Sequence, residues 1–467
     1  MLHVKNGIRL LNIFLGALLI AGCGGGNDTA PNPAIRSFQT TPSIVSKGQP
    51  TTLFYSYSGL KATLSDGVVT TRLLFGNFTT FKPSATTKYT LTVTNSKGIT
   101  VSASTLVTLS PILGRFSSSA GKTIDPRDNH TATLLPGGKV LIAGGGLGIT
   151  GSNHYHRSAE LFDPATGIST RTTGFMAYSS ALHTATLLNS GKVLVAGGWD
   201  STRSRSDAQL YNPATGTFAP TGSMSDVRSA HTATILNNGT VLIAGGYNGA
   251  SPLASAELYN PATGAFTPTG SMHVARSAHT ATLLNTGKVL IAGGTPDNTR
   301  CELYDPATGT FTLTGSLNLA RSNHTATLLS GGGNAGVLIA GGATAANAEL
   351  YDPVTGTFAF TYSMTVLRTY LTATLLEDTR VLLAGGSGDN TAEFYDPNTR
   401  AFAGPPIQFA PGEVKPLPLL LMNEVRTSHT ATLIPKGTTL SNGSVLTHDM
   451  VLIVGGTGAV SKAELFR

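Results

Sequence analysis

The stretch His279–Gly294, HTATLLNTGKVLIAGG, decides the fold because the chain repeats it. HTATLL or a close variant begins at His130, His183, His231, His279, His324, Leu371 and His429. Each copy runs into an apolar segment that ends in a glycine pair, and a third recurring piece follows, such as AELY at Ala256. The copies are spaced by about 50 residues on average, a period typical of β-propeller blades and longer than that of helical solenoids. The repeat therefore predicts seven similar all-β units.

One unit divides into four strands separated by turn signals. His279–Leu284 alternates polar and apolar residues, and a tight hairpin turn follows at Asn285–Gly287. Val289–Gly294 is almost wholly apolar, as expected for a strand that packs on both faces. Glu302–Asp305 and Phe311–Ser316 are the third and fourth strands, joined by a turn in which proline and glycine favour a reversal. Each unit is thus predicted to be a four-stranded antiparallel sheet.

This unit resembles the kelch motif. An arginine precedes the first strand, a glycine pair ends the second, Tyr-Asp-Pro follows the third and an aromatic residue begins the fourth. The chain has phenylalanine, as at Phe311, or Ile168 where kelch repeats commonly have tryptophan. The resemblance covers residues 114–467. It implies that residues 111–467 form a seven-bladed kelch β-propeller, similar to the central domain of galactose oxidase.

The last unit of the repeat lacks its fourth strand, because the chain ends at Arg467 inside the third. The segment Gly114–Lys122 stands before the first HTATLL, where fourth strands stand elsewhere. We expect this segment to complete the seventh blade, which would leave no exposed sheet edge between the two ends of the ring.

The N-terminus carries a predicted secretory signal over residues 1–22. Its apolar run, Leu10–Ile20, is too short to span a bilayer comfortably. The sequence Ile20–Cys23 resembles a bacterial lipobox, which implies acylation of Cys23 and anchoring in a membrane. Gly24 in place of aspartate favours the outer membrane in lipoproteins of this kind. The alternative is an ordinary signal peptide with a chance cysteine.

Between the leader and the repeats we predict a flexible tether and one small domain. Residues 23–33 are rich in glycine, asparagine and proline. Residues 34–110 alternate apolar and polar residues between turn signals. The hairpin TKYTLTVTNSKG, Thr87–Gly98, resembles bacterial immunoglobulin-like domains, which implies a β-sandwich that serves as a spacer or docking module.

The recurrent histidines and glycines are predicted to be structural. Six of the 11 histidines share one slot, but a ring of seven sheets about 10 Å apart has a radius of about 11 Å. Imidazoles cannot converge on one metal ion across that distance. The glycine pairs are not followed by a helix start, which a phosphate-binding loop requires. We therefore predict no metal and no cofactor.

A buried ion pair is predicted within most units, since arginine recurs before the first strand and glutamate in the third. The pairs include Arg228 with Glu257, Arg276 with Glu302, and Arg321 with Glu349. The second unit departs at both positions, with Ser180 and Gln209. The alternative is an open basic ring that binds an anionic ligand.

The connections after the glycine pairs differ most between units, which marks the face that can specialise. Three neighbouring connections carry the candidate ligand-binding residues His154, Tyr155, His156, Trp199, Arg203, Arg205 and Tyr247. Aromatic and arginine side chains of this kind suit a protein or glycan ligand. Two histidines without a third ligand do not define a metal site. The proline-rich insertion at residues 404–423 is expected on the same face.

Function is predicted from these connections and from the anchor. A net charge of +7 without Lys/Arg runs or an interleaved aromatic pattern argues against nucleic acid. Galactose-oxidase-type enzymes need a copper site with a tyrosine cross-linked to a cysteine, and Cys301 occupies a slot that is alanine in the other units. We predict a lipid-anchored, non-catalytic binding protein. The alternatives are a carbohydrate-active enzyme, of sugar oxidase or isomerase type, and a structural component of an envelope assembly.

Overall fold

The computed structural model describes residues 32–41, 44–45, 51–59, 61–67, 70–73, 78–81, 87–109, 116–117, 121–147, 155–296, 299–329, 336–386, 388–403, 420–457 and 461–467. These residues form strands and turns and no helix, so none of them provides an apolar helix that could cross a membrane. The chain divides into two compact units, Met1–Leu113 and Gly114–Arg467, which are described separately. The predicted leader, Cys23, the tether up to residue 31, His154 and residues 404–419 of the insertion lie outside the described residues.

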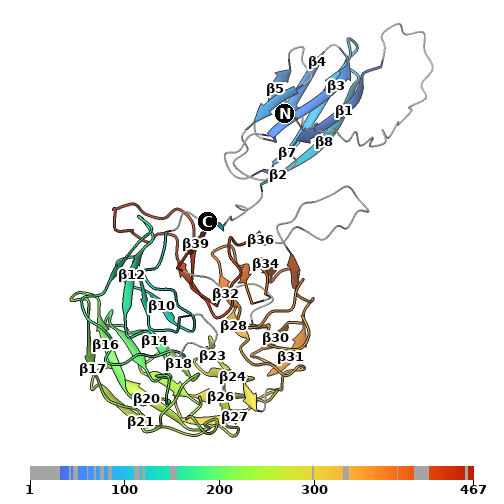
Figure 1. Cartoon of the computed structure of the whole chain (residues 1–467). Helices are drawn as coiled ribbons and strands as arrows, with labels where there is room; N and C mark the ends of the chain where they lie inside the picture. Colours follow the sequence, from blue (N-terminus) through green and yellow to red (C-terminus); the bar gives the residue numbers. More distant parts are fainter. Residues whose placement is uncertain are drawn as a thin grey trace, which may run out of the picture. The chain divides into compact units, whose positions relative to one another are not determined.

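The first unit consists of two sheets that share one core (Figure 1). One sheet has the order β1 (Ala34–Thr41), β3 (Thr51–Ser58), β6 (Phe78–Phe81), and the other β2 (Ile44–Val45), β8 (Thr100–Leu109), β7 (Thr87–Thr94), β4 (Lys61–Ser65), β5 (Thr70–Leu73). Leu53 of the first sheet packs with Leu64 and Leu91 of the second. Alternate residues of β7 are buried, so its apolar and polar alternation creates the core face. That this sandwich is immunoglobulin-like stays a prediction.

The second unit contains seven successive sheets over the residues described, each with four main strands in antiparallel order (Figure 1). From the inner to the outer strand they are β10 (Thr131–Leu134), β11 (Val140–Ala143), β12 (Ala159–Asp163), β13 (Ile168–Arg171); β14 (Thr184–Leu187), β15 (Val193–Ala196), β16 (Ala208–Asn212), β17 (Thr217–Pro220); β18 (Thr232–Ile235), β19 (Val241–Ala244), β20 (Ala256–Asn260), β21 (Ala265–Pro268); β23 (Thr280–Leu283), β24 (Val289–Ala292), β26 (Cys301–Asp305), β27 (Thr310–Leu313); β28 (Thr325–Leu328), β29 (Val337–Ala340), β30 (Glu349–Asp352), β31 (Thr357–Phe360); β32 (Thr372–Leu375), β33 (Val381–Ala384), β34 (Thr391–Asp396), β35 (Ala401–Ala403); and β37 (Thr430–Ile434), β38 (Met450–Val454), β39 (Ala463–Phe466), β9 (Phe116–Ser117). Two short strands, β22 (Arg276–Ser277) and β25 (Thr295–Pro296), pair with each other, and β36 (Leu420–Leu421) pairs with β34.

The second strand of every sheet is buried on both faces, which explains its continuous apolar sequence. In β19, Val241 and Ile243 pack against the preceding sheet, whereas Leu242 and Ala244 pack against the following one. Burial of each large aliphatic side chain stabilises the fold by about 1.5–3 kcal/mol. The sheets therefore stack face to face around the ring, and each interface is an apolar layer.

The inner strands contact one another in sequence, and the inner strand of the seventh sheet, β37, contacts that of the first, β10. The fourth strand of the seventh sheet is β9, from the beginning of the unit. It pairs antiparallel with β39, with Phe116 opposite Phe466 and Ser117 opposite Leu465. The N-terminal strand predicted to complete this sheet is present, although only two residues of it are in strand conformation.

The inner strands are shorter than the sequence predicts, and the glycine pairs lie outside the second strands. His279 precedes β23 because Ala278 has a φ of 52°, which turns the chain out of the strand. Gly293 and Gly294 have φ values of 62° and 95° and end the ladder after Ala292. A Cβ on Gly293 would lie 2.6 Å from the Arg321 carbonyl oxygen of the next sheet, so the close approach between sheets requires glycine.

Candidate functional site

A ring of seven residues with left-handed backbone surrounds the centre of the propeller at the start of the inner strands. Their φ values lie between 48° and 57°. They are Asn129, Leu182, Ala230, Ala278, Asn323, Tyr370 and Ser428. Each peptide N–H donates to the carbonyl oxygen of the equivalent residue in the preceding sheet at 3.0–3.1 Å, and Asn129 N–H donates to Ser428 O. The seven hydrogen bonds thus form a closed circle, which we call the central ring. Left-handed backbone costs a residue other than glycine roughly 1–2 kcal/mol.

The histidine that follows each ring residue joins neighbouring inner strands. Its Nε2 is hydrogen-bonded to a threonine Oγ1 of the preceding sheet, as between His279 and Thr232 at 3.0 Å. Equivalent contacts, at 2.9–3.0 Å, join His130 to Thr430, His183 to Thr131, His231 to Thr184, His324 to Thr280 and His429 to Thr372. Leu371 replaces the histidine in the sixth sheet and packs in an apolar cluster with Met364. The recurrent histidines are structural connectors.

Burial keeps these histidines neutral. It lowers the pKa of His183 to about 4 and those of His231, His324 and His429 to about 3. The pKa values of His130 and His279 are also lowered well below 6.5, by burial and by the nearby Arg127 and Arg276 guanidinium groups. Near neutral pH the centre of the propeller therefore carries no histidine charge.

The central ring and these histidines line a cavity of about 320 Å³. The ring side chains at its mouth include Leu182, which is 42% exposed, and Tyr370, which is 47% exposed. The residues lining the cavity comprise asparagine, histidine, leucine, alanine, tyrosine and serine, and none has a formal charge once the histidines are neutral.

The recurrent arginine and glutamate form an ion pair in six sheets. Arg228 lies 2.9 Å from Glu257, Arg276 3.0 Å from Glu302, and Arg321 3.1 Å from Glu349. Equivalent pairs are Arg127 with Glu160, Arg368 with Glu393 and Arg426 with Glu464. All six arginines are at most 1% exposed. The alternative of an open basic ring is therefore wrong, because these guanidinium groups do not reach solvent.

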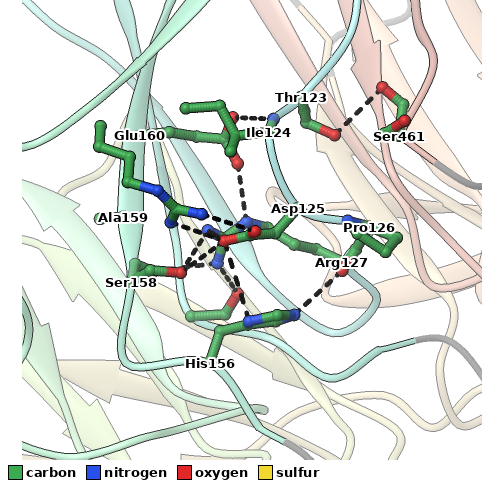
Figure 2. A network of polar contacts seen from close by, with 12 residues as sticks. Thr123, Ile124, Asp125, Pro126, Arg127, His156, Ser158, Ala159, Glu160 and Ser461 are labelled. Carbon is green, nitrogen blue, oxygen red and sulfur yellow. Dashed lines mark hydrogen bonds and ion pairs between the residues drawn. The ribbon is translucent and has the colours of Figure 1, made fainter.

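Figure 2 shows how completely one of these arginines is bonded. Arg127 donates to Glu160, to the carbonyl oxygens of Gly144 and Ser158, to Ser158 Oγ and to Asp125. Burial raises the pKa of Asp125, but hydrogen bonds from Arg171 and Ser158 and the charge of Arg127 outweigh it and lower that pKa to about 2. This network fastens the segment before β10 to β12.

The second sheet has no arginine–glutamate pair and satisfies the equivalent backbone groups with Ser180 and Gln209. Ser180 Oγ donates to Gly197 O at 3.0 Å, a bond that an arginine makes elsewhere, and Gln209 Oε1 accepts from Ala177 N–H at 3.1 Å. An arginine that is not part of the repeat, Arg205, lies on the β15–β16 connection of this sheet. It contacts Asp207 at 2.6 Å and lies 4.3 Å above the Tyr178 ring.

The candidate ligand-binding residues lie on adjacent connections. Trp199 is half-buried and its backbone pairs with Ala181, next to the central ring. Its ring reaches the β19–β20 connection, where a Cβ on Gly249 would lie 3.8 Å from Cζ3. Tyr247 is half-buried on that connection, and its carbonyl oxygen accepts from Ser204 Oγ at 2.8 Å. The structure therefore brings Trp199 and Tyr247 onto one face.

The remaining candidates differ in how free they are to bind a ligand. The Arg203 side chain is 70% exposed and lies 3.8 Å from Asp200. Arg205 is held by Asp200 and Asp207 and its side chain is only 16% exposed. His156 Nε2 is hydrogen-bonded to Pro126 O at 3.1 Å (Figure 2), while Tyr155 is half-buried on the same β11–β12 connection. Arg205 and His156 are thus held mainly by contacts within the propeller.

Sequence reasoning missed the residues of the central ring. They stand immediately before the recurrent histidine, at a position that varies between asparagine, leucine, alanine, tyrosine and serine while its neighbours repeat. That variation within a constant frame was the available signal.

Comparison with known proteins supports the kelch fold. The model of the kelch motif matches residues 183–225 and 228–273. Among solved structures, a fungal alcohol oxidase of the AA5 family, determined in complex with copper, is similar with a TM-score of 0.55. It is 15% identical, and the match covers 76% of each chain. A search of curated proteins found no match. The chain therefore carries kelch motifs on a galactose-oxidase-like, all-β propeller fold.

Two observations bear on metal and redox chemistry. Within the described ranges, no three His, Cys, Asp or Glu side chains are grouped so that they could hold a metal ion. Cys301 is 0% exposed in β26, opposite Ala292, and burial raises the pKa of its thiol to about 11. The thiol therefore occupies the interior of a sheet interface, where the other sheets have alanine.

Proposed function

We propose that this protein is a lipid-anchored binding protein of the bacterial cell envelope, whose propeller binds a protein or glycan without transforming it. The binding face carries the β11–β12, β15–β16 and β19–β20 connections. One observation carries the proposal: the repeated polar residues are bonded within the frame, whereas the unrepeated Trp199, Arg203 and Tyr247 gather on adjacent connections of one face. Large aromatic and arginine side chains dominate the energy of binding surfaces.

The binding face is tested by replacing Trp199 and Arg203 together with alanine. Hot-spot residues of this kind cost 2 kcal/mol or more when truncated, which is roughly a 30-fold loss of affinity. The assay is a glycan array combined with an array of envelope proteins, followed by titration of each hit. Val354→Ala is the matched control, because Val354 is 93% exposed in the turn between β30 and β31, at the opposite end of the strands. Equal losses in both variants, or none in either, would contradict this choice of face.

The same experiment distinguishes the binding function from its rival, sugar oxidation or isomerisation. The likeness to an alcohol oxidase shows the fold alone. To test for activity directly, the array hits are also incubated with the copper-loaded protein under oxygen. Saturable binding with neither peroxide release nor altered sugar supports the binding protein. Turnover above that of a heat-inactivated sample would show that the protein is an enzyme and would refute the non-catalytic function.

The anchor is tested at Cys23. The cysteine follows the lipobox-like sequence that ends at Gly22, and several acyl chains on one residue would give stable membrane attachment. We expect a clickable palmitate analogue to label the wild-type protein and not Cys23→Ser, and the variant to leave the membrane fraction. Unchanged membrane partition of the variant would count against lipid anchoring.

A further inference from the structure

The side chains of the central ring divide the cavity mouth into two unlike halves. Asn323, Tyr370, Ser428 and Asn129 come from the fifth, sixth, seventh and first sheets, which are consecutive around the ring. The second, third and fourth sheets supply Leu182, Ala230 and Ala278. One wall of the mouth is therefore polar and the opposite wall is apolar.

The polar half is free to bind. Within the part of the chain that the structure describes, the side chains of Asn129, Asn323, Tyr370 and Ser428 have no hydrogen-bond partner. Two amides, a phenol and a hydroxyl supply both donors and acceptors. Ligand hydroxyl groups, which both donate and accept hydrogen bonds, can pair with these donors and acceptors.

The cavity lining offers no charged side chain to a ligand. None of its lining side chains is Asp, Glu, Lys or Arg, and its histidines are neutral. A charged ligand would lose hydration there without gaining a counter-charge, which is costly. The recurrent arginines do not compensate, because they are buried against glutamates.

The backbone of the ring gives a second reason to expect a ligand. The chain uses glycine at the positive-φ position of hairpin turns, as at Gly191, Gly239 and Gly287. It nevertheless keeps leucine at φ 55° and tyrosine at φ 57° in the ring. Non-glycine residues held in this conformation are concentrated at ligand-binding sites, and these two residues line the cavity and are partly exposed.

We infer that the central cavity binds one neutral pyranose ring, with its hydroxyl groups on the wall formed by Asn129, Asn323, Tyr370 and Ser428 and its apolar face toward Leu182. The volume of about 320 Å³ lies at the lower end of ligand cavities, roughly 300–1,000 Å³, and suits a single sugar ring. This inference rests on the proposed function, since it names the ligand class and places the sugar at the centre of the binding face.

The test is calorimetric titration of the purified full-length protein with methyl glycosides of glucose, galactose, mannose and N-acetylglucosamine. Glucuronate and glucosamine are the charged counterparts. At least one neutral glycoside binds, and the charged sugars bind at least tenfold more weakly. Tyr370→Gly and Asn323→Gly remove the side chain while tolerating the left-handed backbone, and each lowers affinity at least tenfold. Tyr362→Ala, at a tyrosine that is 69% exposed and does not line the cavity, is the control and leaves affinity unchanged. Thermal melts establish that all three variants are folded.

The outcomes separate this inference from the proposed function. If glycoside binding survives both ring variants and is lost in the Trp199/Arg203 double variant, the sugar binds on the connections and the central cavity is overturned. If no neutral glycoside binds at 20 mM while a protein from the array binds, the sugar inference fails and the binding function stands. Charged sugars binding as tightly as neutral ones would also overturn it.

Discussion

Removing one buried arginine while leaving its glutamate should damage the propeller more than removing both. The chosen pair is Arg276 and Glu302, whose side chains are 0% exposed and 3.0 Å apart. In Arg276→Ser the carboxylate keeps the backbone N–H groups of His273 and Val274, at 2.8 and 3.2 Å, and the His273 ring at 2.9 Å, but loses its guanidinium partner. The Arg300 carbonyl oxygen loses a donor at the same time, whereas the new serine hydroxyl can donate to Gly293 O, as Ser180 does to Gly197 O.

The magnitude follows from the burial. Breaking a buried pair by removing one partner costs about 3–5 kcal/mol. A unit of about 350 residues loses about 1.3 °C of Tm per kcal/mol, so Arg276→Ser should lower the Tm of the propeller by about 4–7 °C. Adding Glu302→Gln reproduces the Ser180 and Gln209 arrangement of the second sheet. Removing one member of a buried ion pair is costly, whereas replacing both members is often neutral, so the double variant should melt above Arg276→Ser by up to about 4–7 °C.

Differential scanning calorimetry of the wild type, both single variants and the double variant completes the cycle. The first unit of the chain provides an internal control, because its transition should not move. The reasoning is refuted if the double variant melts no higher than Arg276→Ser, since the carboxylate would then carry no unpaired charge in the single variant. A loss of less than 1 °C in Arg276→Ser would refute it as well.

Two further predictions concern the histidines and the ends of the ring. Burial lowers the pKa of His324 from 6.5 to about 3, so the unfolded chain binds a proton at a higher pH than the folded chain does. The free energy of unfolding is therefore at its full value above about pH 6.5. Below that pH it falls progressively, by up to about 2 kcal/mol per histidine at pH 5. His324→Leu, which copies Leu371, should reduce the drop in Tm between pH 7.5 and pH 5 by about one sixth, and an unchanged drop would contradict the assignment. Phe116 lies 5.2 Å from Phe466, centroid to centroid, and aromatic pairs contribute about 0.5–1.5 kcal/mol beyond their burial. Deleting residues 114–122 should lower the Tm more than Phe116→Ala and increase amide exchange at Leu465, whereas an unaffected melt would show that β9 does not hold the seventh sheet.

The repeat made the architecture predictable because the same sequence pattern occurs in each blade and each occurrence is independent evidence for the strands. The alternation in HTATLL and the apolar run before Gly293 indicate strands, and the six copies that keep the histidine outweigh the irregular one, LTATLL at Leu371. Strand ends were less predictable. His279 reads as the first residue of an alternating strand, but its side chain bonds to Thr232 of the neighbouring sheet, and no periodicity encodes a contact between sheets.

The site was only partly predictable, for the same reason. Arg205 looked free to bind a ligand because the pattern showed it only as an unrepeated charge. The structure places it against Asp200, Asp207 and Tyr178, which hold its guanidinium group. The residues of the central ring were inconspicuous because a single variable position between arginine and histidine has no pattern of its own. Only the circular arrangement of the sheets brings Asn323, Tyr370 and Ser428 together.

The central ring also determines the electric field at the axis of the propeller. A peptide group has a dipole of about 3.5 D, and aligned dipoles in a helix add up to a field that attracts ions at its ends. In the ring every N–H donates in the same rotational sense: Leu182 donates to Asn129, Asn129 donates to Ser428, and the other residues continue in this direction around the circle. The dipole components that point along a closed circle cancel one another. Seven backbone amides therefore surround the opening without acting as an anion trap, and the electrostatic preference of the cavity is left to the side chains that each blade can change separately.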